Sequence, residues 1–303
     1  MLFLSKFYKK TALFTLTALT AATLSGCALW NNQSSLTAGS SGTDAASSSE
    51  NSAVSAIGMQ SGDSKEFNSF LMELFNEQIT GNSIDFHYSL EHPENYGLSM
   101  DEVTFGTVDL ADMDASLEET KAALNTLQSF HKEELSPRQQ FIYDMLEENF
   151  EDSIKSFDYT LYQTVFSPTI GVQAQLPVIL SEYTFRTQQD VDDYIILLTD
   201  VDRYFSELLG IERAKSEAGL FMSDFTADAI IAQCQDFIAD PESNLLIDIF
   251  QEKLDSEMPG LTNDEKEGYI RQNKEAVIND VIPAYEMVID ELTNLKGTGT
   301  NDK

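Results

Sequence analysis

The sequence predicts an all-α fold, and three features of the chain support this prediction. From residue 63 onward, apolar residues recur three and four positions apart, which is the spacing of one helix face. Residues that favour helix starts stand before several of these runs, and glycine follows the first of them. We therefore expect a multi-helix assembly with one extended or looping insert near residues 159–186.

The first helix is expected over residues 63–81. Asp63 and Glu66 can form a capping pair at its start, and Gly81 is a typical stop. The apolar side chains that would face a core are Phe67, Phe70, Leu71, Leu74, Phe75 and Ile79. A second helix is expected over residues 114–131.

A third helix has a strong start signal. Ser136 stands at the cap position, Pro137 at the first helical position and Gln139 at the third. Proline is tolerated at the first position, because the N–H that it lacks would have no partner inside the helix there. This helix should continue through the stretch QFIYDMLEENF that follows.

The middle of the chain departs from the helical pattern. Pro168, Gly171 and Pro177 stand among aromatic and β-branched residues in the insert. This composition favours extended or looping chain, and we expect a short helix only near residues 177–183. Later helices are expected at residues 187–219, 225–239 and 243–256 and from Thr262 onward, the last with a kink at Pro283.

The charge of the chain excludes one class of partner. It contains 51 acidic and 18 basic residues, and three of the basic residues lie within the first ten positions. Residues 1–62 hold two of the acidic residues, so the rest of the chain carries 49 acidic and 15 basic residues. Such a charge repels nucleic acid and anionic lipid headgroups, and we expect no nucleic-acid partner.

The N-terminus resembles a bacterial lipoprotein signal. Three lysines precede a weakly apolar run over residues 11–23, which is too short to span a bilayer as a helix. The sequence Leu-Ser-Gly-Cys, ending at Cys27, then matches a lipobox, in which the cysteine thiol accepts the lipid. The alternative is an ordinary export signal with an incidental cysteine. We expect lipid attachment at Cys27, and hence a location at the extracytoplasmic face of the cell membrane.

Three segments follow from this interpretation. Residues 1–26 form the signal peptide, residues 27–62 the lipidated cysteine with a flexible tether, and residues 63–303 the helical domain. The tether is rich in Ser, Ala and Gly and lacks a periodic apolar pattern. A flexible coil of this length spans about 30 Å, well beyond the Debye length of about 8 Å in physiological salt. The tether can therefore hold an acidic domain away from an anionic surface.

The chain shows no catalytic or metal-binding motif. The three histidines, His87, His92 and His131, are not followed by glutamate, and the first two are five residues apart with proline next. Acidic runs lack the glycine that a calcium loop requires, so solvated helix faces are the simpler interpretation. Cys234 lies among apolar residues at helical spacing, which favours a buried structural thiol. We expect no catalytic residue, metal ligand or cofactor in these 303 residues.

The insert is the best candidate for a ligand-binding surface. Polar side chains stand there among proline and aromatic residues, where loop backbone is also free to bind. The alternative is that these side chains satisfy the backbone of the insert itself. The candidate residues are Gln173, Gln175, Glu182, Tyr183 and Arg186.

Several blocks of the sequence together resemble the bacterial family called domain of unknown function 885. The blocks are FNSFLMELF, FHYSLEHPENYG, GVQAQLPVILSEYTFRTQQDVDDY, AGLFMS, PAY and the closing GTGTN. Members of this family are similar in being helical, and many are exported lipoproteins. They are longer than this chain, and their second half carries a His-Glu-x-x-Pro-Gly-His motif that makes them resemble zinc peptidases. That motif is absent here, so no catalytic residue of the family maps onto this sequence.

Two functions remain open at this point. The resemblance implies that the chain is the N-terminal, incomplete half of a larger helical domain in an anchored, zinc-peptidase-like hydrolase. It would be inactive alone, and the missing C-terminal half, a possible partner, would supply the zinc site. The alternative is a non-catalytic surface lipoprotein that binds a peptide or another ligand.

Overall fold

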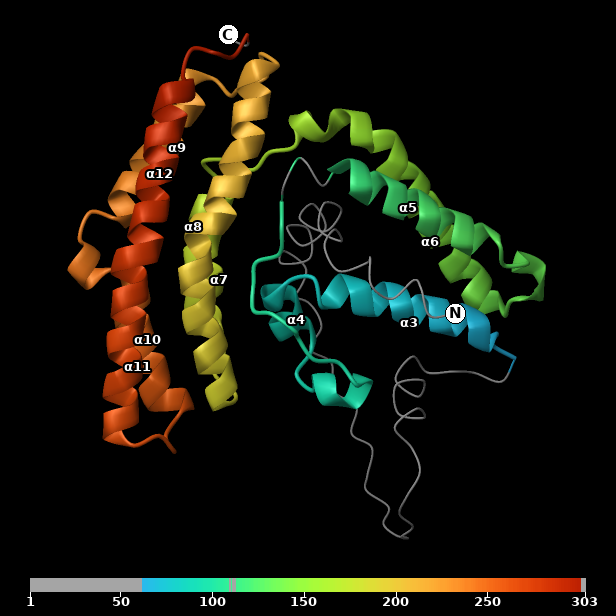
Figure 1. The fold of residues 1–303 in the computed structure, drawn as a ribbon, viewed down its shortest axis with the longest axis horizontal. Helices are drawn as coiled ribbons and strands as arrows, with labels where there is room; N and C mark the ends of the chain where they lie inside the picture. Colours follow the sequence, from blue (N-terminus) through green and yellow to red (C-terminus); the bar gives the residue numbers. More distant parts are fainter. Residues whose placement is uncertain (1–61, 109, 111–112, 301–303) are drawn as a thin grey trace. The chain divides into compact units, whose positions relative to one another are not determined.

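The computed structural model describes residues 62–108, 110 and 113–300, and the chain is all-α over these ranges (Figure 1). None of the described residues lies in a strand, so the predicted fold class is confirmed. The described residues form two compact units. Unit 1 holds those up to Asp101 and those from Ala115 to Ile154, and unit 2 holds those from Glu102 to Asp114 and from Lys155 onward.

Unit 1 is a helical group built around aromatic side chains. Phe67 is fully buried, and the ring of Phe130 meets it edge-on at a centroid distance of 5.2 Å. Phe70, Leu127 and Tyr143 complete the centre of this core. The elements are α3 (Lys65–Ile79), α4 (Ser83–Ser89), η1 (Pro93–Tyr96), most of α5 (Met113–Gln128), η3 (Lys132–Glu134) and most of α6 (Pro137–Ser156).

The helix starts in unit 1 confirm one predicted cap and correct another. Ser136 caps α6 as predicted, because its hydroxyl accepts a hydrogen bond from the Gln139 N–H at 3.4 Å. The cap of α3 is Ser64 and not Asp63, because the Ser64 hydroxyl accepts from the Phe67 N–H at 3.2 Å. Asp63 instead accepts a hydrogen bond from the Ser136 hydroxyl at 2.6 Å, which joins the starts of the two helices.

Unit 2 is arranged around the long helix α8. Helix α12 packs against α8 and α9, and α10 packs against α7 and α11 (Figure 1). Helix α8 is capped at the predicted residue, Thr187, which forms a capping box with Asp190, and it ends before Gly219, where φ is +72°. The elements are η4 (Phe157–Tyr162), α7 (Val172–Glu182), α8 (Gln188–Glu217), α9 (Asp224–Phe237), η5 (Pro241–Ser243), α10 (Leu245–Glu257), α11 (Asn263–Ala276), η6 (Val277–Val281) and α12 (Ile282–Leu295).

The prediction for the insert was partly wrong, because α7 begins at Val172 and runs through Pro177. Proline has no N–H, so it cannot donate to the carbonyl of Gln173 four residues earlier. The hydroxyl of Tyr285 on α12 donates to that carbonyl at 2.7 Å instead. A donor from a distant segment therefore satisfies the group that the proline leaves open, and the helix continues where local signals predict loop.

The second interior proline is also accommodated in a way that the sequence pattern did not predict. We expected a kink at Pro283, and the structure shows that a π-helical turn, η6, joins α11 and α12 just before it. The N–H of Ile282 donates to the carbonyl of Val277 five residues earlier. Pro283 therefore directly follows this wider turn, at the second residue of α12.

The Gly-Thr-Gly-Thr turn after α12 folds back onto the loop that follows α8. The carbonyl of Gly219 accepts hydrogen bonds from the Thr300 N–H at 3.0 Å and from the Thr300 hydroxyl at 2.9 Å. A Cβ at Gly299 would lie 2.3 Å from the carbonyl oxygen of Phe221, so only glycine fits there. The contact between Thr300 and Gly219 joins two of the blocks that carry the family resemblance, the closing GTGTN and AGLFMS.

Candidate functional site

The five residues predicted to bind a ligand lie along α7 and the loop after it, and two of them point into the interior. Gln173 is buried, and its side-chain amide donates to the Ser167 carbonyl at 2.7 Å and to Gln233 Oε1 at 3.0 Å. It therefore closes the loop before α7. Tyr183 is also buried and packs against the rings of Phe185 and Tyr194.

The other three predicted residues are more accessible but do not converge on one point. Gln175 is half-buried, whereas Glu182 and Arg186 are exposed. Gln175 and Glu182 are seven residues apart along α7, which corresponds to about 10 Å along a helix axis. The backbone N–H of Arg186 donates to Asp190 at 2.9 Å, at the start of α8. Ligand binding at these residues remains a prediction, and Cys27 lies outside the described residues.

The structure offers no group of side chains that fits a zinc ion within the ranges that it describes. His87 is buried in α4, and His92 is an exposed side chain within 3.2 Å of Glu94. Over residues 62–108, 110 and 113–300, no cluster of three or more His, Cys, Asp or Glu could hold a metal ion. We therefore assign no metal-dependent step to these residues.

Cys234 is a buried thiol, as its sequence context predicts. It is fully enclosed on α9, and burial raises its pKa to about 12. A thiol with such a pKa is protonated at neutral pH and is a poor nucleophile. Its role is packing.

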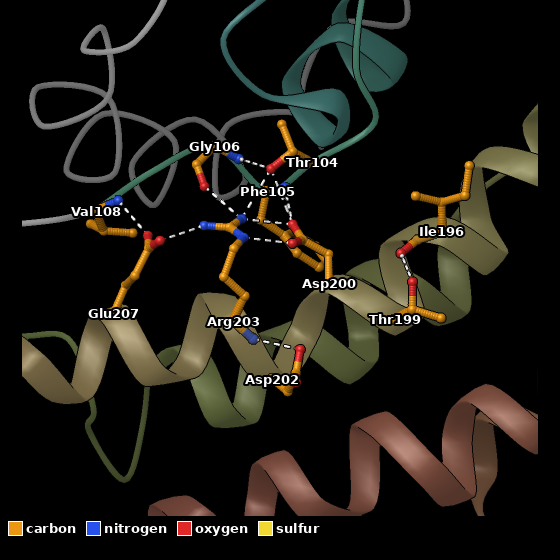
Figure 2. Close-up of polar contacts among 10 residues, drawn as sticks. All are labelled: Thr104, Phe105, Gly106, Val108, Ile196, Thr199, Asp200, Asp202, Arg203 and Glu207. Carbon is orange, nitrogen blue, oxygen red and sulfur yellow. Dashed lines mark hydrogen bonds and ion pairs between the residues drawn. The ribbon is translucent and has the colours of Figure 1, made fainter.

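A polar cluster on α8 links several side chains by hydrogen bonds and ion pairs (Figure 2). Asp200, Arg203 and Glu207 lie three and four residues apart, so they share one helix face. Arg203 Nε donates to Asp200 Oδ1 at 2.6 Å, and Arg203 Nη1 donates to Glu207 Oε1 at 2.7 Å. We call these three residues the α8 clamp.

The α8 clamp binds a stretch of chain without regular secondary structure, residues 104–108, which we call the strap (Figure 2). Asp200 Oδ2 accepts from the Phe105 N–H at 3.0 Å, and Glu207 Oε2 accepts from the Val108 N–H at 2.8 Å. Arg203 Nη2 donates to the Gly106 carbonyl at 2.8 Å. The clamp thus binds the main chain of the strap through both donor and acceptor groups.

The charges within the α8 clamp support one another. The hydrogen bond to Asp200, and then that to Glu207, hold the pKa of the Arg203 guanidinium well above its usual value, although burial opposes this. Arg203 is therefore charged at every pH at which the protein folds. About a third of its side chain remains exposed, so water can still reach the cluster.

An aromatic contact completes the binding of the strap. The ring of Phe105 is buried and stacks on Tyr204 of α8 at a centroid distance of 5.1 Å. Gly106 has a φ of +80°, a conformation that favours glycine. The Thr104 hydroxyl donates to Asp200 Oδ2 at 3.1 Å and accepts from the Gly106 N–H at 3.1 Å. This part of α8 therefore binds a segment of main chain through hydrogen bonds and a ring contact.

Sequence reasoning missed this cluster. Residues 200–207 lie within a predicted helix, where charged residues usually form a solvated face. The usable signal was the spacing of Asp200, Arg203 and Glu207, which places an arginine between two carboxylates on one face. No local signal identified the strap as the segment that binds there, because it lies about a hundred positions earlier in the chain.

A second ionic pair on α8 is buried. Glu212 and Lys215 are 1% and 6% exposed, and Lys215 Nζ donates to Glu212 Oε1 at 2.7 Å. Burial raises the pKa of Glu212, and the nearby Lys215 opposes that shift. Glu212 Oε2 has no hydrogen-bond partner among the described residues.

The family and the fold of the chain follow from comparison with known proteins. No curated protein matches the sequence. The fold is similar to a crystal structure described as "the putative lipoprotein from Colwellia psychrerythraea", with a TM-score of 0.65 and 15% sequence identity. The similarity covers 78% of this chain but 42% of the other, so the matched part of this chain spans less than half the length of that solved protein.

The family assignment rests on a match over most of the chain. Residues 94–303 match the family described as "Bacterial protein of unknown function (DUF885)". This range includes α5 to α12, the strap, the α8 clamp and the closing turn. Because the match covers more than half of the sequence, the protein belongs to the DUF885 family.

Proposed function

We propose that this protein is an exported lipoprotein, anchored through Cys27, and that its helical part is the N-terminal half of a zinc-peptidase-like hydrolase. The observation that carries the second part is the coverage of 42% of the solved chain, which points to a longer fold. The lipobox at residues 24–27 supports the first part. None of the described helices is long and apolar enough to cross a membrane.

In this proposal, the described helices form one wall of a substrate cleft, and further polypeptide supplies zinc and the catalytic groups. Exposed apolar side chains support the idea of a covering segment. Tyr159, Tyr162 and Ile170, all in the region before α7, are more than 60% exposed. Such a group of large apolar side chains is consistent with a surface that the second half of a family protein covers.

The anchor can be tested in the producing cell. Replacing Cys27 with serine removes the thiol that would accept the lipid, and we expect the protein to leave the membrane fraction. Cys234→Ala is the matched control, because it removes the buried thiol and leaves the lipobox intact. Retention of Cys27→Ser in the membrane, or a mass without lipid for the wild type, would contradict the anchor.

The catalytic proposal is tested on the full chain in detergent. We expect the purified protein to bind no stoichiometric zinc and to leave a mixed peptide library uncut. Addition of the second half of a homologous family protein should give a complex that binds zinc and cleaves peptides. Stoichiometric zinc together with peptide cleavage by the chain alone would show that the proposal is wrong.

A non-catalytic peptide-binding lipoprotein is the second candidate, and the α8 clamp favours it because it already binds main-chain groups. This function predicts that the chain alone unfolds cooperatively and does not bind a hydrophobic dye. The zinc-peptidase-like function predicts dye binding at the exposed Tyr159 and Tyr162. Tyr162→Ser should then reduce the dye signal.

A further inference from the structure

The strap occupies the α8 clamp in the way that a bound peptide would. Its three main-chain contacts alternate between donor and acceptor: the Phe105 N–H, the Gly106 carbonyl and the Val108 N–H. Main-chain groups are common to all peptides, so these contacts do not depend on the side chains of the strap. Selectivity would come from the buried ring of Phe105 and from the φ of +80° at Gly106.

The α8 clamp is organised by contacts within α8 itself. Both oxygens of Asp200 and Glu207 Oε1 accept hydrogen bonds from Arg203, while Asp200 Oδ2 and Glu207 Oε2 also accept from the strap. The two carboxylates therefore keep their orientation through Arg203 when the strap is absent. A preorganised site binds with less loss of conformational freedom than one that must be assembled on binding.

The topology of the chain makes the strap a separable segment. Glu102–Asp114 belongs to unit 2, but the residues before and after it belong to unit 1. The strap is therefore held in unit 2 by its hydrogen bonds and ring contact with α8. It is not the continuation of a helix of that unit. It can leave the clamp without unwinding α8, because each of the clamp's contacts to the strap comes from an α8 side chain.

We propose that the α8 clamp, together with Tyr204, is a binding site for peptides that contain an aromatic residue followed by glycine, and that the strap blocks this site in cis. This inference goes beyond the proposed function and does not depend on zinc or on a second half. A free peptide must compete with a segment whose effective concentration is of millimolar order. Binding to the wild type should therefore be weak, and it should strengthen when the strap is weakened.

The test uses a fluorescent peptide with the sequence EVTFGTVDL, which corresponds to residues 102–110, and the full chain in detergent. Phe105→Ala removes the aromatic anchor of the strap and leaves α8 unchanged. We expect this variant to bind the peptide about tenfold more tightly than the wild type does, measured by fluorescence polarisation. The matched peptide EVTAGTVDL should not bind.

Two further variants keep the inference falsifiable. Adding Arg203→Met to Phe105→Ala should abolish peptide binding, because it removes the donor to the peptide carbonyl. Thr104→Val weakens the strap without opening a cavity, and it decides the question if Phe105→Ala does not fold. If the folded strap variants bind no more tightly than the wild type, or if Arg203→Met leaves binding unchanged, the inference is wrong.

Discussion

The two ionic groups of α8 differ in burial and in how completely they are hydrogen-bonded. In the α8 clamp, every carboxylate oxygen of Asp200 and Glu207 has a partner, and the cluster is open to water at Arg203. In the buried pair, Glu212 and Lys215 are almost fully enclosed, and Glu212 Oε2 lacks a partner among the described residues. The same helix thus carries charges in two very different environments.

This difference separates a binding role from a structural role. Burying an ion pair costs desolvation energy that the attraction between its charges only partly offsets, so the intact pair contributes little net stability. Removing one of the two charges is nevertheless strongly destabilising, because the other charge is left buried without a partner. A partly exposed cluster pays less of that cost and can release one partner to water. The α8 clamp is therefore suited to hold a segment that leaves, whereas separating Glu212 from Lys215 should destabilise the fold.

The largest effect should come from breaking the buried pair. Lys215→Met leaves the Glu212 carboxylate buried without its cation, and we expect a loss of about 3–5 kcal/mol in the free energy of unfolding at neutral pH. Urea unfolding followed by circular dichroism measures this loss. The matched control on the same helix is Arg213→Met, which breaks an exposed pair with Glu291 and should cost no more than about 1 kcal/mol. Equal losses of stability in Lys215→Met and Arg213→Met would show that burial does not set the contribution of these pairs.

A smaller effect is expected in the α8 clamp. Arg203→Met removes the donor to the Gly106 carbonyl and leaves two carboxylates on one helix face, which should cost about 1–3 kcal/mol. Arg203→Lys keeps the charge but lacks the forked guanidinium, so its loss should be intermediate. Urea unfolding of the wild type, Arg203→Lys and Arg203→Met measures the order of their stabilities. A lysine variant as stable as the wild type would show that charge alone holds the strap.

The smallest effect concerns pH. Burial raises the pKa of Glu212, so the folded state holds this proton more tightly than the unfolded chain does. The resulting stabilisation is complete below the usual carboxyl pKa and is lost as the pH rises through the raised value. Each unit of pKa difference corresponds to about 1.4 kcal/mol, so Glu212→Gln should flatten the fall in stability as the pH rises above the usual carboxyl pKa. If the dependence of stability on pH is the same in Glu212→Gln and the wild type, another group causes it.

The sequence predicted the helices whose signals are local. Thr187 with Asp190 and Ser136 with Gln139 start helices as expected, because a cap involves only three or four neighbouring residues. Pro177 misled the prediction for the opposite reason. The hydroxyl that makes a helix possible there comes from Tyr285, more than a hundred residues later in the chain.

The same distinction applies to the candidate site. Arginine between two carboxylates at helical spacing is visible in the sequence, but the strap that it binds is not. The pairing of Phe105 with Asp200 depends on tertiary folding, which single-sequence patterns do not contain. Conversely, the polarity of Gln173 suggested ligand binding, whereas in the structure its side chain closes the loop before α7.

Amide hydrogen exchange of the wild-type chain most directly tests the claim that the strap is a separable ligand of the α8 clamp. The N–H groups of Phe105 and Val108 report on the strap, and that of Leu209 reports on buried α8. We predict that the strap amides exchange by local opening, well before Leu209, and that Arg203→Met accelerates the strap amides alone. Exchange of all three amides at the same rate, only through global unfolding, would contradict the account.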